Sequence, residues 1–155
     1  MRNGPGPRTD LALLLIRLTV GAVFFAHGAQ KVFGWFGGPG LKQTVVIMSQ
    51  SYPPIVAYLV SFGELTAGLG LIFGFLTRIA AAGMFIEMLG AVFLVHWRAG
   101  FFSRNKGFEF PLTLCLVSLA IVLEGGGAFS LEAKLKRNRT RTLEVSRRVP
   151  ATEAG

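Results

Sequence analysis

Seven of the ionisable side chains within or beside the long apolar stretches of this 155-residue chain are placed where they could do chemistry. They are Arg17, His27, Lys31, Glu64, Glu87, His96 and Glu109. An ionisable group costs about 2.5–3.5 kcal/mol to insert into a bilayer, so such residues should face other protein groups. Acids, bases and cations gathered in a low-dielectric interior can bind a polar ligand or exchange protons with it. These residues are therefore ligand-binding candidates, and no catalytic residue is assigned.

Three of the seven are expected near the middle of the membrane. Glu64 and Glu87 fall near the centres of their apolar stretches, and Arg17 lies at a depth from which it can reach a carboxylate. The simplest hypothesis is an Arg17–Glu64 ion pair, or an Arg17 bridge to both carboxylates. Such a pair either fixes helix packing or binds a ligand, and the sequence leaves both interpretations open.

A second polar group is expected at the outer end of the helices. His27 and Lys31 are four residues apart and share a helix face, and His96 and Glu109 lie at a comparable depth. His96 follows Glu87 by nine residues, which places the two on opposite faces of a regular helix. The two polar groups could nevertheless line one cavity that opens outward, or the histidines could be interfacial residues without a ligand.

Other chemistries lack their usual residues. Cys115 is the single cysteine, which excludes an intramolecular disulfide and a thiolate cluster, and in an apolar helix it is most often a small buried hydrophobe. We find no metal, haem or flavin motif. The net charge is +8, and seven of the sixteen Lys and Arg residues follow Leu131. Without stacking aromatics this predicts no nucleic-acid binding but a solvated, partly disordered tail near anionic lipid.

The elements that must position these residues are helices. The chain is 52% hydrophobic and 15% charged, which excludes a disordered protein. About 20 apolar residues cross a bilayer as a helix. We therefore predict an all-α integral membrane protein, a bundle of four transmembrane helices in contact with the lipid bilayer. Its helices are expected at about residues 11–33, 54–74, 77–97 and 108–124, with a short interfacial helix over 41–50.

Loop charges predict the orientation of these helices. Four spans place both termini on one side, together with Arg2, Arg8, Arg78 and the basic tail. The opposite side carries fewer cations, so both termini are expected in the cytoplasm. The predicted organisation is a cytoplasmic segment over residues 1–10, a membrane domain over 11–131 and a basic cytoplasmic tail over 132–155. Close helix contacts through small residues also allow a homodimer.

The order of several residues resembles the DoxX family. The first block contains Arg17, His27, Gly28, Lys31 and Gly34, followed by Gly38 and Gly40; the second contains Glu64, Gly68, Leu71, Gly74, Thr77 and Arg78; the remainder contains His96, Glu109, Gly125, Gly127, Ser130 and Leu131. The resemblance covers about residues 11–131. Glu132 stands where the family often has aspartate, and Glu87 matches no family position, so its role rests on its depth alone.

The resemblance implies a four-helix protein of the bacterial inner membrane. DoxX-like and DoxD-like proteins are associated with thiosulfate:quinone oxidoreductase, with thiol oxidation and with oxidative-stress defence. The leading hypothesis is therefore a membrane subunit of a redox system with a quinone site, incomplete as an enzyme. Its electrons would come from a bound quinone or from a partner such as a soluble redox enzyme. Lys31 could attract an anion such as thiosulfate. The alternatives are a protein that binds or transports a small molecule or lipid, and a scaffold that recruits a soluble enzyme through its tail.

Overall fold

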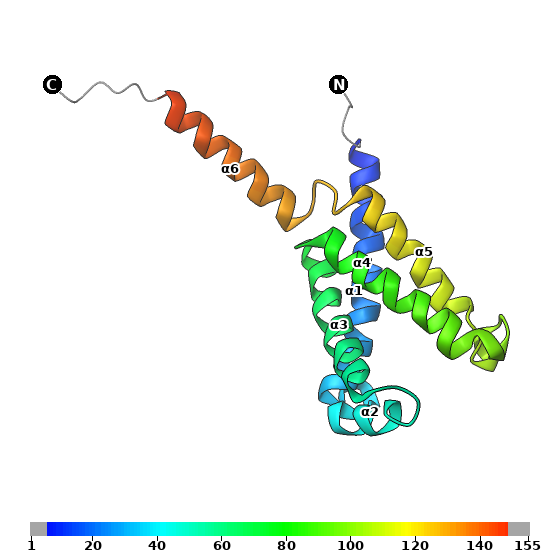
Figure 1. The fold of residues 1–155 in the computed structure, drawn as a ribbon. Coiled ribbons are helices and arrows are strands. Elements are labelled where there is room, and N and C mark those ends of the chain that lie inside the picture. The colour runs from blue at the N-terminus through cyan, green and yellow to red at the C-terminus, as the bar shows by residue number, and fades with distance from the viewer. Residues whose placement is uncertain (1–5, 149–155) are drawn as a thin grey trace.

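The computed structural model describes residues 6–148, and these residues form an all-helical fold without strands (Figure 1). Residues 1–5, which include Arg2, and 149–155 belong to the predicted terminal segments and lie outside the described residues. The helices are α1 (Pro7–Phe33), α2 (Gly40–Met48), α3 (Pro54–Phe73), α4 (Thr77–Gly90), α5 (Glu109–Glu124) and α6 (Leu131–Arg148). A π-helical segment, Ala91–His96, continues α4, and short 3-10 turns lie at Trp35–Gly37, Trp97–Ala99 and Ser103–Asn105. The predicted all-α fold is confirmed.

Proline and glycine set the ends of the two helices that pack most closely. Pro7 and Pro54 stand in the first turns of α1 and α3, where a missing N–H costs nothing and φ is already helical. Gly34 and Gly74 end these helices with φ of 74° and 68°. This left-handed conformation is easily adopted only by glycine, so both positions act as helix stops.

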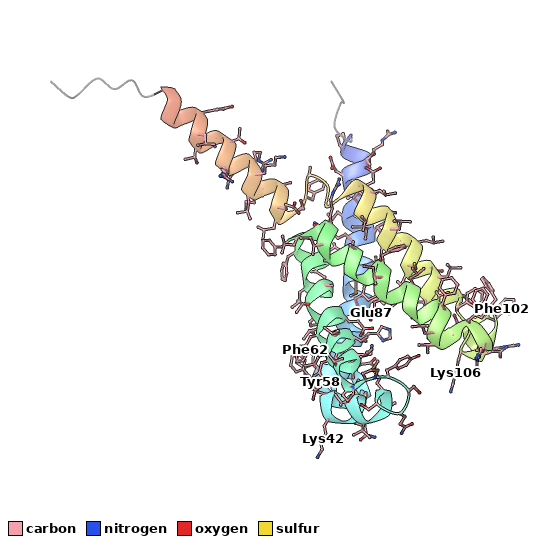
Figure 2. The ribbon with its side chains drawn as sticks, viewed as in Figure 1. Lys42, Tyr58, Phe62, Glu87, Phe102 and Lys106 are labelled. Carbon is pink, nitrogen blue, oxygen red and sulfur yellow. The ribbon has the colours of Figure 1, made fainter. Side chains whose placement is uncertain are left out.

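The helices form two antiparallel pairs that diverge from a common end (Figure 1). α1 packs along α3, and α4 packs along α5. The pairs are joined at the end where α3 leads into α4 and where α5 ends beside α1, and α2 lies at the other end. We call the joined end the inner end and the α2 end the outer end. In Figure 2, Lys42 and Lys106 mark the outer ends of the two pairs.

Glycines allow α1 and α3 to approach closely. A Cβ added at Gly28 would clash with the backbone of Leu65, and one at Gly68 would clash with the backbone of Phe25. At Gly21 an added Cβ would lie 3.0 Å from the backbone nitrogen of Ile72. Small residues promote such contacts because they let helix backbones pack without intervening side chains.

Among residues 6–148, three helical stretches are long and apolar enough to cross a membrane: Pro7–Phe33, Pro54–Phe73 and Thr77–Ala99. α5 has 16 residues, fewer than the roughly 20 that span the hydrocarbon. Many large apolar side chains point outward, including Ile86 and Leu94. Such an outer surface suits lipid and not water.

The expectation of a partly disordered basic tail was wrong for the described residues. Leu131–Arg148 is a helix, α6, which leads away from the bundle (Figure 1). Ser130 starts it, because its hydroxyl oxygen accepts a hydrogen bond of 3.1 Å from the Ala133 N–H. A serine in this position satisfies a free amide of the first turn, and the Lys, Arg, Leu and Glu residues that follow favour helix.

Candidate functional site

A cavity of about 390 Å³ lies between the α1–α3 pair and the α4–α5 pair. This size is typical of small-molecule sites, which are mostly apolar and contain a few polar groups. Five of the seven candidate residues line it, namely His27, Lys31, Glu64, Glu87 and His96. Arg17 and Glu109 do not line it. The structure therefore brings residues from both predicted polar groups into one cavity.

Lys31 and Glu64 form an ion pair through Lys31 Nζ and Glu64 Oε2. Only 24% of the Lys31 side chain and 6% of the Glu64 side chain are exposed. Gly28, one turn before Lys31, contacts the backbone at Leu65, beside Glu64. The close approach of α1 and α3 therefore brings the two side chains together, and Lys31 in the last turn of α1 also complements the negative end of the helix dipole.

The hypothesis of an Arg17–Glu64 pair is wrong, because the two residues lie at different levels. Gly28 packs against Leu65 and Gly21 against Ile72, so Arg17 lies level with Gly74 at the inner end. Arg17 is also fourteen residues before Lys31, about 21 Å along the helix. Its side chain is 2% exposed, and its Nη2 donates a hydrogen bond of 3.3 Å to the Phe129 carbonyl.

Glu87 points into the cavity from α4 and reaches the α3 side. Figure 2 shows it near the centre of the molecule, where the two helix pairs face each other. Its Oε2 would lie 3.5 Å from a Cβ placed on Gly63, in the turn of α3 that precedes Glu64. Lys31, Glu64 and Glu87 thus form a cluster of ionisable groups on the cavity wall.

His96 lines the same cavity as Glu87, although a regular helix would place the two residues on opposite faces, and the π-helical segment explains how. A π-helix forms its hydrogen bonds over five residues and places more residues in each turn than an α-helix. The segment Ala91–His96 therefore turns His96 by less than a regular helix would. The segment contains about one residue more per turn than an α-helix, so the His96 side chain faces the cavity.

A hydrogen bond orients the His96 ring. Its Nδ1 lies 2.6 Å from the Lys106 carbonyl oxygen. A carbonyl oxygen can only accept, so Nδ1 carries the proton and donates it to this bond. Nε2 is then the ring nitrogen left for other interactions, as an acceptor when the imidazole is neutral.

Glu109 acts outside the cavity, at the outer loop. Its Oε2 accepts a hydrogen bond of 2.9 Å from the Ser103 N–H, which closes the loop before α5. The neighbouring Phe110 lines the cavity instead, with its ring centroid 6.5 Å from that of His27. The prediction that Glu109 joins the histidines at the cavity was therefore wrong by one position.

Tyr52 is a cavity residue that the sequence did not identify as one. It lies between α2 and α3 and contributes to the cavity wall. Its hydroxyl donates a hydrogen bond of 3.3 Å to the Leu94 carbonyl in the π-helical segment. The sequence around Tyr52 does not indicate this contact, because the contact depends on where the π-helical segment after α4 lies in the fold.

The cavity is open to the molecular surface between the two helix pairs, because some of its lining residues are exposed. Ile86 and Leu94 line it, yet they are 68% and 71% exposed. Both residues belong to a stretch long and apolar enough to cross a membrane, Thr77–Ala99. The opening therefore faces the region that lipid would occupy, so a molecule dissolved in the bilayer could enter the cavity sideways.

Metal chemistry has no evident site in the described part of the chain. Among residues 6–148 no group of three or more His, Cys, Asp or Glu side chains is arranged to hold a metal ion. Cys115 is buried in the apolar core, as expected for a small hydrophobe.

Comparisons with known proteins agree with this picture. The DoxX family model matches residues 12–97. CatD of Bacillus subtilis, whose name describes it provisionally as an oxidoreductase, is 30% identical over 79% of this chain and 86% of its own length. The membrane protein Rv3486 of Mycobacterium tuberculosis is 29% identical over 83% of this chain and 84% of its own length. The inner membrane protein YqjF of Escherichia coli is 27% identical, with 83% and 95% covered. No solved structure matches the chain.

Proposed function

Because this chain belongs to the DoxX family, we propose that it is a membrane subunit of a redox system and that its cavity binds a quinone. The observation that carries the proposal is a cavity with apolar walls and a small cluster of ionisable groups, Lys31, Glu64 and Glu87. A quinone needs hydrogen-bonding partners for its ring oxygens and an apolar path for its tail. The oxidoreductase name of CatD supports a redox role.

In this proposal the cavity residues bind and orient the ring and exchange protons with it. The ammonium of Lys31 has three donors, and the ion pair with Glu64 leaves others for a quinone oxygen. Glu87 holds or accepts a proton, and His96 Nε2 accepts one from a quinol hydroxyl. Conversion of quinone to quinol takes up two electrons and two protons, and we assign delivery of the electrons to a soluble redox enzyme.

The charges of the cavity argue against an anion such as thiosulfate as its ligand. The positive charge of Lys31 is already paired with Glu64, and Glu87 adds a second carboxyl group. An anion would have to approach these carboxyl groups without an unpaired cation among the described lining residues. An uncharged ligand avoids this repulsion, so we place the oxidation of any sulfur compound on the partner enzyme.

The proposal includes four membrane spans in the bacterial inner membrane, with both termini in the cytoplasm. α5 is short, but it packs along α4 and its outer face is apolar, with Leu116 and Leu123 exposed. The excess of cations on the side of the termini supports the orientation. The name of YqjF supports an inner-membrane location.

A second candidate function is the binding or transport of another lipid-soluble small molecule. The opening between the two helix pairs favours it, since that opening would serve any apolar ligand. Four helices are few for a transporter, so this function would suit a homodimer. A scaffold that recruits an enzyme through the basic tail would require neither the cavity nor its charges.

The test is to purify the protein in mild detergent and to identify bound small molecules by native mass spectrometry and solvent extraction. We expect a stoichiometric quinone in the wild type and its loss in Glu87→Gln, with retention in Glu124→Gln, a carboxylate change at the inner end outside the cavity. A different stoichiometric ligand would favour the second candidate. An empty cavity, with function lost only when residues 135–155 are deleted, would favour the scaffold and overturn the proposal.

A further inference from the structure

The basic helix α6 has almost no protein to pack against. Its first turn is tied to the bundle, since the Glu132 N–H donates a hydrogen bond of 3.1 Å to the Gly74 carbonyl at the end of α3. Beyond Lys136, the side chains that the structure describes are exposed as far as Glu144. Helices shorter than about 12–15 residues are marginal in water, and longer ones still draw most of their stability from packing. Another surface must therefore supply the stabilising contacts that the bundle does not give to α6.

The charge of α6 indicates what that surface is. Leu131–Arg148 contains seven Lys and Arg residues and two glutamates. Like charges at this density repel one another along a helix, so α6 is most stable where anions surround it. Anionic headgroups at a membrane surface attract such basic segments.

The spacing of the uncharged residues fits an interface. Leu131, Leu135, Asn138 and Thr142 recur at intervals of four, three and four and so form one stripe along the helix. Leu131 and Leu135 are 42% and 52% exposed. The stripe is apolar at Leu131 and Leu135 and uncharged at Asn138 and Thr142. A helix with such a stripe between cationic flanks lies in the plane of a membrane, with the stripe toward the acyl chains.

The N-terminal end of α6 lies where a membrane boundary is expected. It starts beside the inner end of α3 and close to Arg17 of α1, which bonds to the Phe129 carbonyl. Large apolar side chains are exposed around this point, among them Phe73, Phe75 and Phe129. The bundle therefore holds the first turn of a cationic helix at the edge of the hydrocarbon, within a Debye length of the headgroups.

We infer that α6 binds the surface of anionic phospholipids in the membrane that holds the bundle, with the Leu131–Leu135–Thr142 stripe toward the acyl chains and the cations among the phosphates. The inference does not depend on the quinone site. It uses the proposed topology only to say that the surface is the cytoplasmic leaflet.

The experiment reconstitutes the full chain in nanodiscs whose two leaflets have the same composition, so it does not depend on the topology. In a Cys115→Ala background, a fluorophore is attached at Leu135→Cys on the stripe or, as a matched control, at Thr140→Cys on the opposite side. Quenching by a water-soluble collider is compared in phosphatidylcholine alone and in mixtures with phosphatidylglycerol. We expect anionic lipid to protect position 135 severalfold more than position 140, and molar salt to remove the protection.

A charge variant tests whether attraction between the α6 cations and the anionic headgroups causes the protection. The variant replaces four cations by glutamine at once: Lys136, Arg137, Arg139 and Arg141. This change should abolish the protection at position 135, because each cation near an anionic surface changes the ratio of membrane-bound to free helix about fivefold. Equal quenching at the two positions in anionic discs would overturn the inference. So would protection that is the same in neutral and anionic lipid, or protection that appears only when an acidic polypeptide such as polyglutamate is added to neutral discs.

Discussion

At the scale of single residues, the proposed site depends on the Lys31–Glu64 pair. The pair lies on the cavity wall, and Glu87 extends it toward α4. A buried ion pair adds little net stability compared with apolar residues, but removal of one partner leaves a charge without compensation. Packing and ligand binding should therefore respond differently when the partners are changed singly and together.

The first prediction concerns this pair. Lys31→Met should destabilise the protein by about 3 kcal/mol, because it leaves Glu64 unpaired in an apolar surrounding. The double variant Lys31→Met with Glu64→Leu should recover most of the stability and still bind no quinone. Thermal unfolding in detergent and quinone binding measure the two effects. A double variant that binds quinone as the wild type does would show that the pair serves packing alone.

The second prediction concerns Arg17, which the structure separates from the cavity. Arg17→Gln should lower the unfolding temperature, because the guanidinium fills a buried space and bonds to Phe129 at the inner end. Quinone affinity should stay unchanged. Arg8→Gln, at an exposed position of the same helix, is the control and should alter neither property. Loss of quinone binding in Arg17→Gln without loss of stability would restore Arg17 to the site.

At the scale of elements, the glycine contacts between α1 and α3 bring Lys31 and Glu64 together. Gly28 leaves no space for a methyl group, whereas Gly83 on α4 has no neighbouring atom within 4 Å of an added Cβ. The same substitution should therefore have opposite effects at the two positions, which separates helix contact from helix propensity.

The third prediction is that Gly28→Ala destabilises the protein by about 1–3 kcal/mol through overpacking, with a parallel loss of quinone affinity. Gly83→Ala should be neutral or stabilising by about 0.5–1 kcal/mol, because alanine favours helix over glycine. Thermal unfolding of both variants in the same detergent tests this. An equal effect of the two changes would argue against a close α1–α3 contact.

The elements also show where sequence reasoning reached its limit. The length of the apolar stretches and their low charge were enough to predict the all-helical fold. The partner of Glu64 could not be predicted, because estimates of depth do not fix the register of α1 against α3. The helix face of His96 could not be predicted, because a π-helical segment leaves no mark in the spacing of side chains. Glu109 was placed at the cavity instead of Phe110, because the start of a helix cannot be predicted from sequence to within one residue.

At the scale of the whole molecule, two helix pairs diverge from the inner end and leave the cavity between them (Figure 1). The inner end carries most of the cations, namely Arg8 at the start of α1, Arg78 at the start of α4 and those of α6. The cavity lies toward the outer end. This arrangement suits a protein that takes its ligand from the bilayer and meets a soluble partner at the cytoplasmic surface.

The fourth prediction tests the orientation that this arrangement requires. In a Cys115→Ala background, cysteines at Thr140 and at Lys42 should react on opposite sides of the membrane, because α3, α4 and α5 lie between them. In intact cells a membrane-impermeant maleimide should label the Lys42→Cys protein, and it should label the Thr140→Cys protein only after the inner membrane is opened. Labelling of both positions in intact cells would contradict an odd number of spans between them and a cytoplasmic tail.

The most direct test of the quinone site is photolabelling of the purified protein with an azido-quinone, followed by mass-spectrometric mapping of the modified residues. We expect modification within residues 56–64 of α3 and 86–96 of α4 and the π-helical segment, competed by an unlabelled quinone and greatly reduced in Glu87→Gln. Modification spread over the lipid-facing surface, or left unchanged by the competitor, would contradict a quinone site in the cavity.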